Sequence, residues 1–133
     1  NNHMGSHLTQ LVAPMSWTMG FLKQHRLLFL DSKTSPYSKA SDIAKAVGVP
    51  VKNRNIFLDN QLTDSYISQQ FQLLIKHANS QKMAIAIAHP HPETIKVLKR
   101  LIPTLAKNNI ELVPLSALYL PIKGHQTQLA VGE

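Results

Sequence analysis

The sequence lacks cysteine and has few aromatic residues. None of its 133 residues is cysteine, which excludes both a disulfide framework and a thiolate metal site. A bound metal ion would therefore need histidine, aspartate or glutamate ligands. Aromatic residues make up 6% of the chain, and none is interleaved with the basic helical ridge formed by Lys96, Lys99 and Arg100. Because proteins bind single-stranded nucleic acids by stacking the bases on aromatic side chains, this composition does not indicate a nucleic-acid site.

Acidic residues are also scarce. Seven Asp and Glu residues stand against 14 Lys and Arg residues, which gives a formal net charge of +7. The basic residues are dispersed, without a block of five like charges, as is typical of solvated helix faces. We therefore expect no nucleic-acid partner, while an affinity for anionic polymers stays open. No apolar run approaches the roughly 20 residues of a membrane span, so no transmembrane segment is predicted in this chain.

The chain begins Asn1-Asn2-His3 without an initiator methionine and without a visible secretory signal. We expect it to be the latter part of a longer protein. Residues 1–7 have two interpretations, a native segment or the remnant of a cloning vector. The order, with His-Met before Gly-Ser, favours the native segment.

Apolar residues predict helices that alternate with short strands, the arrangement of a parallel sheet or of part of a barrel. The predicted elements are a helix from Leu8 with Thr9 as a possible cap, a strand over 27–30, a helix ended by Gly48, a strand over 54–58, a helix capped by Thr63, a strand over 83–88, a helix from Pro92 and a strand over 110–115. We predict one domain over residues 1–119 and a loose tail over 120–133.

The last of these helices has a predicted buried face and a predicted break. Pro92 and Glu93 suit its first turn, because proline fits there and the carboxylate meets the positive end of the helix dipole. Pro103 is expected to bend or split the helix. The side chains predicted to be buried are Ile95, Leu98, Ile102 and Leu105.

Ionisable side chains stand at the ends of three predicted strands, namely Asp31, Asp59 and His89. The carboxyl ends of parallel strands meet at one edge of a sheet, where α/β proteins place their chemistry. Each aspartate also has a structural alternative, which is to cap the turn that follows it. His89 directly follows the apolar run 83–88, and this edge position favours a role in a site. For His91, solvent exposure is the default interpretation.

His3 and His7 are four residues apart, a spacing that lets two imidazoles reach one metal ion if the segment is helical. Gly5 lies between them, and chance pairs are expected among seven histidines. Alone, this pair is a weak indication of a metal site.

Four ordered segments of the chain together resemble the divergent polysaccharide deacetylases. They are Asn-Asn-His3-Met-Gly-Ser, Phe29-Leu-Asp31-Ser-Lys-Thr34, Arg54-Asn-Ile-Phe-Leu-Asp59-Asn60 and Ala84-Ile-Ala-Ile-Ala-His89-Pro-His91-Pro-Glu-Thr94. The similarity extends to about Tyr119, and it identifies residues 1–6 as native.

This resemblance implies an α/β fold, the C-terminal portion of a deformed (β/α) barrel of the carbohydrate deacetylase type whose N-terminal strands are absent from the chain. It also implies hydrolysis of acetyl groups on a polysaccharide or oligosaccharide, a divalent metal cofactor that is most often zinc, and a location in the periplasm or cell envelope. The paired aspartates of the superfamily would precede this chain, so we expect the chain alone to be catalytically incomplete.

The resemblance further implies roles for individual residues. His3 corresponds to a metal ligand, and His7 reproduces the superfamily's His-x-x-x-His spacing as a second ligand. His89 corresponds to the acid that protonates the leaving group. The other matching positions are Asp31, Arg54 and Asp59 as members of the catalytic site, and Asn2, His91 and Thr94 as substrate-binding residues. The alternative function on the same fold is a module that binds glycan or another anionic envelope polymer without hydrolysis.

Overall fold

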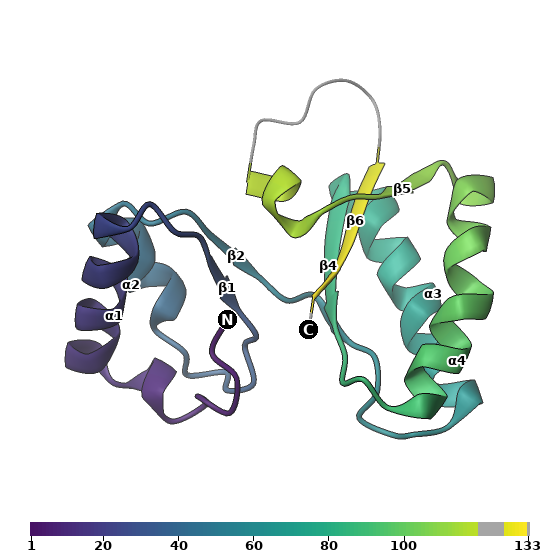
Figure 1. The fold of residues 1–133 in the computed structure, drawn as a ribbon, viewed down its shortest axis with the longest axis horizontal. Helices are drawn as coiled ribbons and strands as arrows, with labels where there is room; N and C mark the ends of the chain where they lie inside the picture. The colour runs from purple at the N-terminus through teal and green to yellow at the C-terminus, as the bar shows by residue number, and fades with distance from the viewer. Residues whose placement is uncertain (120–126, 133) are drawn as a thin grey trace. The chain divides into compact units, whose positions relative to one another are not determined.

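The structure, a computed structural model, describes residues 1–119 and 127–132. The chain divides into two compact units, Asn1–Arg54 and Asn55–Glu133, each with its own sheet and its own hydrophobic core (Figure 1). Strands alternate with helices, and every described strand pair is parallel. The predicted α/β class with parallel strands is therefore confirmed. That both units belong to one domain stays a prediction.

The first unit is a pair of helices beside a two-stranded sheet. Its elements are η1 (Leu8–Gln10), α1 (Val12–Gln24), β1 (Phe29–Asp31), α2 (Ala40–Val47) and β2 (Val51–Asn53). Strands β1 and β2 pair in parallel, with Leu30 opposite Lys52. The buried core of this unit consists of Met15, Met19, Phe29, Ala40, Ala44 and Val49.

The ends of α1 and α2 test two sequence predictions. Gly48 ends α2 with φ of 84°, in the left-handed region that glycine adopts without strain, as predicted. The prediction that Thr9 caps the first helix is wrong, because α1 begins at Val12 and its N-cap residue is Leu11. Thr9 lies in η1 instead, and its hydroxyl donates to the carbonyl of Ser6 at 3.2 Å.

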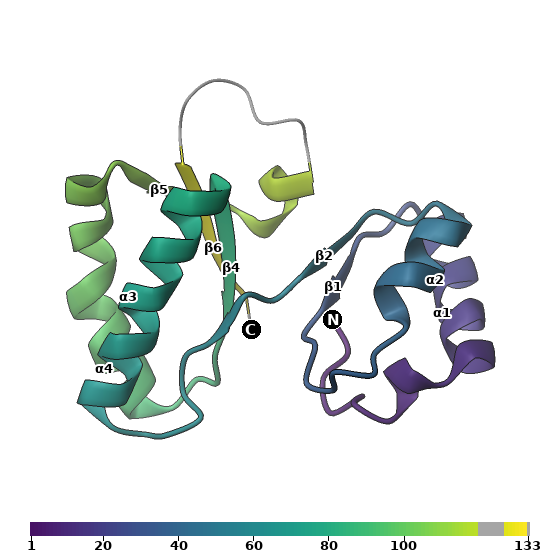
Figure 2. The same cartoon turned by 180° about the vertical axis from the view of Figure 1, so that it is seen from behind.

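The second unit is a four-stranded parallel sheet with two long helices beside it. Its elements are β3 (Ile56–Phe57), α3 (Asp64–Gln81), β4 (Met83–Ile87), α4 (Pro92–Leu101), η2 (Ile102–Asn108), β5 (Ile110–Leu112), η3 (Leu115–Tyr119) and β6 (Thr127–Gly132). The strand order is β3-β4-β6-β5. Figure 2 shows α3 and α4 side by side on one face of this sheet, and Figure 1 shows the same arrangement from the other side.

Strand β6 corrects one prediction. It lies between β4 and β5, with Leu129 opposite both Ala84 and Leu112. The predicted loose tail is therefore wrong for residues 127–132, while residues 120–126 and 133 lie outside the described residues. The physical reason is that β4 and β5 each have backbone groups that need partners, a requirement that cannot be seen in the sequence of the tail itself.

The strand predicted over 54–58 is observed as the shorter β3, Ile56–Phe57, and a further strand that was not predicted, β2, precedes it at Val51–Asn53. The backbone N–H of Arg54 donates to Asp31 O at 2.9 Å, whereas that of Asn55 donates to Ile85 O at 2.8 Å. The backbone hydrogen bonds of the chain therefore change from β1 to β4 between the consecutive residues 54 and 55. Asn55 also accepts a hydrogen bond from Ile85 N at 2.8 Å through its side-chain oxygen, which fixes the start of β3 beside β4.

The two long helices of the second unit begin at the predicted positions. Thr63 caps α3, because its hydroxyl accepts a hydrogen bond from Tyr66 N at 3.3 Å. Helix α4 begins at Pro92 and gives way to η2 before Pro103, so the predicted break is confirmed. Within residues 1–119 and 127–132, no helix is long and apolar enough to cross a membrane.

The buried face of α4 differs from the prediction by one residue. Thr94, Val97 and Leu101 are buried, whereas Ile95 is 41% exposed. Leu98 and Ile102 are only partly buried, and Leu105 is buried as predicted. Compared with the prediction, helix α4 is rotated about its axis so that Thr94 points inward in place of Ile95. The Thr94 hydroxyl forms a buried hydrogen bond there, which explains why a polar residue faces the core.

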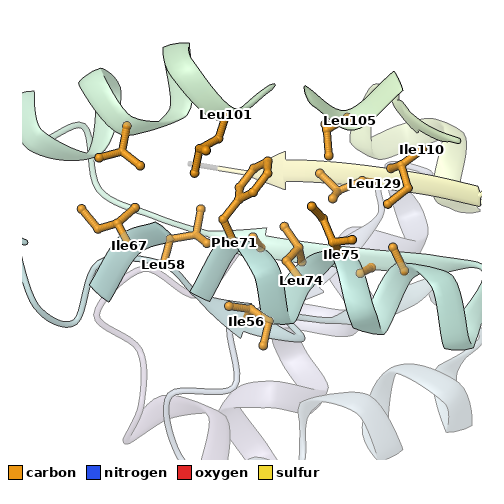
Figure 3. Packing of buried hydrophobic residues seen from close by; sticks show 14 residues of the cluster. Ile56, Leu58, Ile67, Phe71, Leu74, Ile75, Leu101, Leu105, Ile110 and Leu129 are labelled. Carbon is orange, nitrogen blue, oxygen red and sulfur yellow. The ribbon is translucent and has the colours of Figure 1, made fainter. Parts of the chain in front are cut away.

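The core of the second unit lies between the sheet and helices α3 and α4. Figure 3 shows Phe71 of α3 pointing toward Leu101 of α4, with Leu74 and Ile75 beside it. From β4, Ala84 and Ala86 contribute to this core, while Ile85 and Ile87 are also buried. The unbroken apolar run of β4 is therefore covered on both faces, as expected for a strand of a parallel sheet.

Candidate functional site

Asp59 stands two residues after the end of β3, and its carboxylate is completely buried. Leu58 N–H donates to Ile87 O at 3.0 Å, which keeps the end of β3 beside the end of β4. Asp59 Oδ2 accepts two hydrogen bonds, from the backbone N–H of His89 at 2.7 Å and from Thr94 Oγ1 at 2.9 Å. The carboxylate therefore joins the ends of two neighbouring strands to the first turn of α4.

His89 stands at the end of β4, and Asp59 also holds its ring. Nδ1 of His89 lies 3.3 Å from Asp59 Oδ1, and the histidine side chain is 47% exposed. Because an ionised carboxylate can only accept hydrogen bonds, this contact favours the proton on Nδ1. Nε2 lies on the other side of the ring and is left for a ligand or substrate. Two predicted site residues, Asp59 and His89, are thus brought together.

His91 and Phe57 complete the surroundings of the His89 ring. The centroid of the His89 ring lies 5.5 Å from the centroid of the His91 ring and 5.3 Å from the centroid of the Phe57 ring. One possible ligand atom from each of Asp59, His89 and His91 lies within 4.8 Å of the other two. A carboxylate and two imidazoles are donors that zinc uses in hydrolases. These three residues could hold a metal ion.

The structure places Thr94 behind Asp59. Thr94 is 1% exposed, and its hydroxyl donates to the Asp59 carboxylate. Its observed role is to position Asp59, and the predicted contact with substrate stays a prediction.

His3 and His7 lie in the first unit, and both are exposed. His3 is in a turn closed by the hydrogen bond from Gly5 N to Asn2 O at 2.9 Å, and His7 is the residue before η1. Residues 3–7 are therefore not one helix, so the condition for the i, i+4 metal pair is not met. In the described part of the chain, neither histidine belongs to a group of three metal-ligating side chains. Their assignment as metal ligands stays a prediction.

Asn2 anchors the turn that carries His3. Its Oδ1 accepts hydrogen bonds from Ser32 N and Ser32 Oγ, both at 2.8 Å, so the turn is joined to the end of β1. Asn2 is 8% exposed. A Cβ atom at Gly5 would lie 3.1 Å from Asn2 O and 3.2 Å from Asn2 Cβ, which explains the glycine at this position. The observed role of Asn2 is to position the His3 turn, while contact with substrate stays a prediction.

Asp31 follows the structural alternative that its sequence position allowed. Its side chain is buried and accepts hydrogen bonds from Lys33 N at 2.8 Å and Ser38 Oγ at 2.7 Å. The carboxylate thereby fixes the segment that follows β1. The sequence did not single out Ser32 or Ser38. A signal for both was present in the serine-rich run after the strand, since serine hydroxyls often bond to nearby backbone and turn groups.

Arg54 fixes the same segment from the end of β2. Its Nε donates to Ser32 O at 2.5 Å and its Nη2 to Lys33 O at 3.0 Å. Burial lowers the pKa of the Arg54 guanidinium below its ordinary value, and the nearby charge of Asp31 opposes this shift. The guanidinium stays protonated at neutral pH. Whether Asp31 and Arg54 also serve catalysis stays a prediction.

One family model and two uncharacterized bacterial proteins match this chain. The family model for divergent polysaccharide deacetylases matches residues 1–119. The uncharacterized protein YibQ of Escherichia coli K12 is 39% identical over 118 residues, which are 89% of this chain and 37% of that protein. An uncharacterized protein of Haemophilus influenzae is 40% identical over 119 residues, 90% of this chain and 42% of that protein. The chain therefore spans less than half the length of these relatives.

A solved structure has the same fold. The crystal structure of the uncharacterized protein ATU2773 from Agrobacterium tumefaciens C58 matches 85% of this chain and 46% of its own, with a TM-score of 0.83 and 26% sequence identity. This similarity agrees with the predicted α/β portion of a deacetylase-type barrel. From the match of the family model over residues 1–119, the chain belongs to the divergent polysaccharide deacetylase family.

Proposed function

We propose that the full-length protein containing this chain is a metal-dependent hydrolase that removes acetyl groups from a polysaccharide or oligosaccharide. The observation that carries the proposal is the Asp59 carboxylate, which is completely buried and holds both the backbone and the ring of His89. Family membership supplies the class of substrate.

His89 is the proton donor in this proposal. With Nδ1 held by Asp59, Nε2 is the atom that protonates the leaving amine or alkoxide as the acyl bond breaks. The Asp59 carboxylate would hold the ring in this orientation while the proton is transferred. Because Thr94 and the His89 backbone already bind Asp59 Oδ2, the pair is oriented before substrate arrives.

The divalent metal, proposed to be zinc, would polarise the acyl carbonyl and lower the pKa of a bound water to about 7. His3 is its proposed ligand, since its imidazole is exposed and the turn that carries it is fixed by Asn2. His3 offers one nitrogen, His7 stays a predicted second ligand, and the remaining ligands are proposed to come from the rest of the full-length protein. The group Asp59, His89 and His91 is not proposed to hold the catalytic metal, because His89 is needed for proton transfer. The proposed location, periplasm or cell envelope, rests on the family resemblance.

The experiment uses the natural protein at full length. Acetate released from acetylated oligosaccharides is measured together with bound metal for the wild type, His3→Ala and His89→Ala. We expect His89→Ala to lower turnover by about 10²- to 10⁴-fold, and His3→Ala to lower both turnover and bound metal. The control is His77→Ala, an exposed histidine on α3. Unchanged turnover in His89→Ala would contradict the proton-donor role.

The net charge of +7 favours one other candidate function, a binding module for an anionic envelope polymer. This alternative predicts polymer binding that weakens as salt is raised, because screening shortens the range of charge attraction. Salt-sensitive binding without any acetate release or bound metal would favour it over hydrolysis.

A further inference from the structure

Asp59, His89 and His91 lie close together, Asp59 and His89 after the ends of β3 and β4 and His91 at the start of α4. We propose that Asp59, His89 and His91 bind a divalent transition-metal ion that is separate from the catalytic metal, and that this ion blocks proton donation by His89. The binding site rests on the geometry of the second unit alone. Its inhibitory effect rests on the proposed function.

The distance between Asp59 and His89 suits a shared ion as well as a hydrogen bond. Charged N–H···O hydrogen bonds are usually about 2.7–2.9 Å long, whereas Nδ1 and Oδ1 are 3.3 Å apart. Two ligands of a tetrahedral zinc ion, each about 2.0 Å from the metal, are about 3.3 Å apart. The third residue offers a ligand atom within 4.8 Å of the others.

The burial of the three residues differs in a way that suits binding from solvent. Asp59 is buried and held by two hydrogen bonds through Oδ2, so its negative charge is fixed at the bottom of the site. His89 is exposed and His91 is partly exposed, so an ion from solvent can reach both rings. The positive end of the α4 dipole opposes a cation here, but Glu93 in the first turn of α4 offsets part of that field.

The donor set defines the class of ion. Two imidazoles and one carboxylate favour Zn²⁺, Cu²⁺, Ni²⁺ or Co²⁺, whereas Mg²⁺ and Ca²⁺ prefer oxygen ligands. Asp59 already uses Oδ2 for hydrogen bonds, which leaves Oδ1 for a metal. Because the site has fewer protein ligands than a closed structural zinc site, we expect it to fill only when metal is in excess.

An ion at this site and proton donation by His89 exclude each other. A metal binds the neutral imidazole through a nitrogen lone pair, so the bound ring cannot be the doubly protonated imidazolium that donates a proton. The Asp59 carboxylate would then bind the ion instead of the His89 ring. Excess zinc is therefore expected to inhibit hydrolysis without displacing the catalytic metal.

The test measures metal binding directly, on the full-length wild type and on His91→Gln, with His77→Gln as the matched surface control. Co²⁺ is titrated into each protein, and its visible absorption reports coordination by imidazole. We expect wild type and His77→Gln to bind one Co²⁺ more per chain than His91→Gln, or to bind it more than about tenfold more tightly. Inhibition by excess Zn²⁺, expressed relative to each protein's own uninhibited rate, should be lost only in His91→Gln.

Each result has a definite meaning for the two proposals. Identical Co²⁺ binding by wild type and His91→Gln overturns the second site. Loss of turnover together with loss of the tightly bound metal in His91→Gln also overturns it, because the catalytic metal would then lie in this cluster. Loss of Co²⁺ binding in His91→Gln while no protein releases acetate supports the cation site and overturns the proposed hydrolysis.

Discussion

Asp59 holds His89 at two points, accepting a hydrogen bond from its backbone N–H at 2.7 Å and lying 3.3 Å from its ring Nδ1. The carboxylate is buried, while the histidine side chain is 47% exposed. A fixed, desolvated acceptor behind a ring that reaches solvent is the arrangement by which a carboxylate orients a catalytic histidine. The position of His89 is therefore set by the fold rather than by a bound substrate.

Thr94→Val tests the support of Asp59. This substitution keeps the shape of the side chain but removes the hydroxyl that donates to Asp59 Oδ2 at 2.9 Å. Because the acceptor is a buried charged group, we expect the free energy of unfolding to fall by about 1.5–3 kcal/mol. Thr94→Ser keeps the hydroxyl and should recover most of this loss in urea unfolding. Equal stability of the valine and serine variants would contradict the assigned hydrogen bond.

Two glycine substitutions in the first unit should change stability in opposite directions. Gly48 has φ of 84°, and a Cβ atom there would meet only Lys23 Nζ, at 4.0 Å. The cost of Gly48→Ala is therefore conformational, about 1–2 kcal/mol. Gly20 lies within α1, and nothing is within 4 Å of an added Cβ. Gly20→Ala should stabilise the protein by about 0.5–1 kcal/mol.

The midpoints of urea unfolding at constant slope measure both effects. If Gly48→Ala is neutral or stabilising, the left-handed end of α2 is wrong. If Gly20→Ala destabilises instead, the space beside that residue is filled in the full-length protein.

Arg54→Lys tests the segment after β1. The guanidinium donates to two consecutive carbonyls, Ser32 O and Lys33 O, which the single ammonium of lysine cannot reproduce with the same planar geometry. We expect a loss of about 1–2 kcal/mol in unfolding free energy. Faster hydrogen exchange is expected at the Lys33 amide, which donates to Asp31 Oδ1. Unchanged exchange at that amide would show that Arg54 does not hold the segment.

Elements with strong local signals were predictable from the sequence. The unbroken apolar run gave β4 its position and its burial on both faces. The cap at Thr63 and the glycine at position 48 marked the start of α3 and the end of α2. In each case the signal lies within a few residues of the element, so no knowledge of distant partners was needed.

Elements that depend on distant partners were not predictable. Strand β2 contains Lys52 and Asn53 and is defined by its pairing with β1, which its own residues do not indicate. Strand β6 likewise depends on the open sides of β4 and β5. The buried face of α4 was predicted incorrectly because the prediction used the spacing of apolar residues alone, whereas Thr94 points inward to bind Asp59.

The candidate site was predictable in part for the same reason. The positions of Asp59 and His89 at strand ends indicated that both belong to one edge of the sheet, and β3 and β4 are indeed neighbours. That Asp59 contacts both the ring and the backbone of His89 depends on the offset between the two strand ends, which only the folded chain defines. Asp31, at an equivalent sequence position, instead holds the loop that follows it.

In the proposed mechanism His89 donates a proton to the leaving group, and the dependence of the rate on the leaving group tests this role most directly. Hydrolysis of a nitrophenyl acetate, whose leaving group needs no proton, is compared with hydrolysis of an N-acetylated oligosaccharide by the full-length wild type and His89→Ala, without excess zinc. We predict that His89→Ala lowers the rate on the oligosaccharide by about 10²- to 10⁴-fold, while the rate on the nitrophenyl ester changes far less. Equal losses on both substrates would contradict this role.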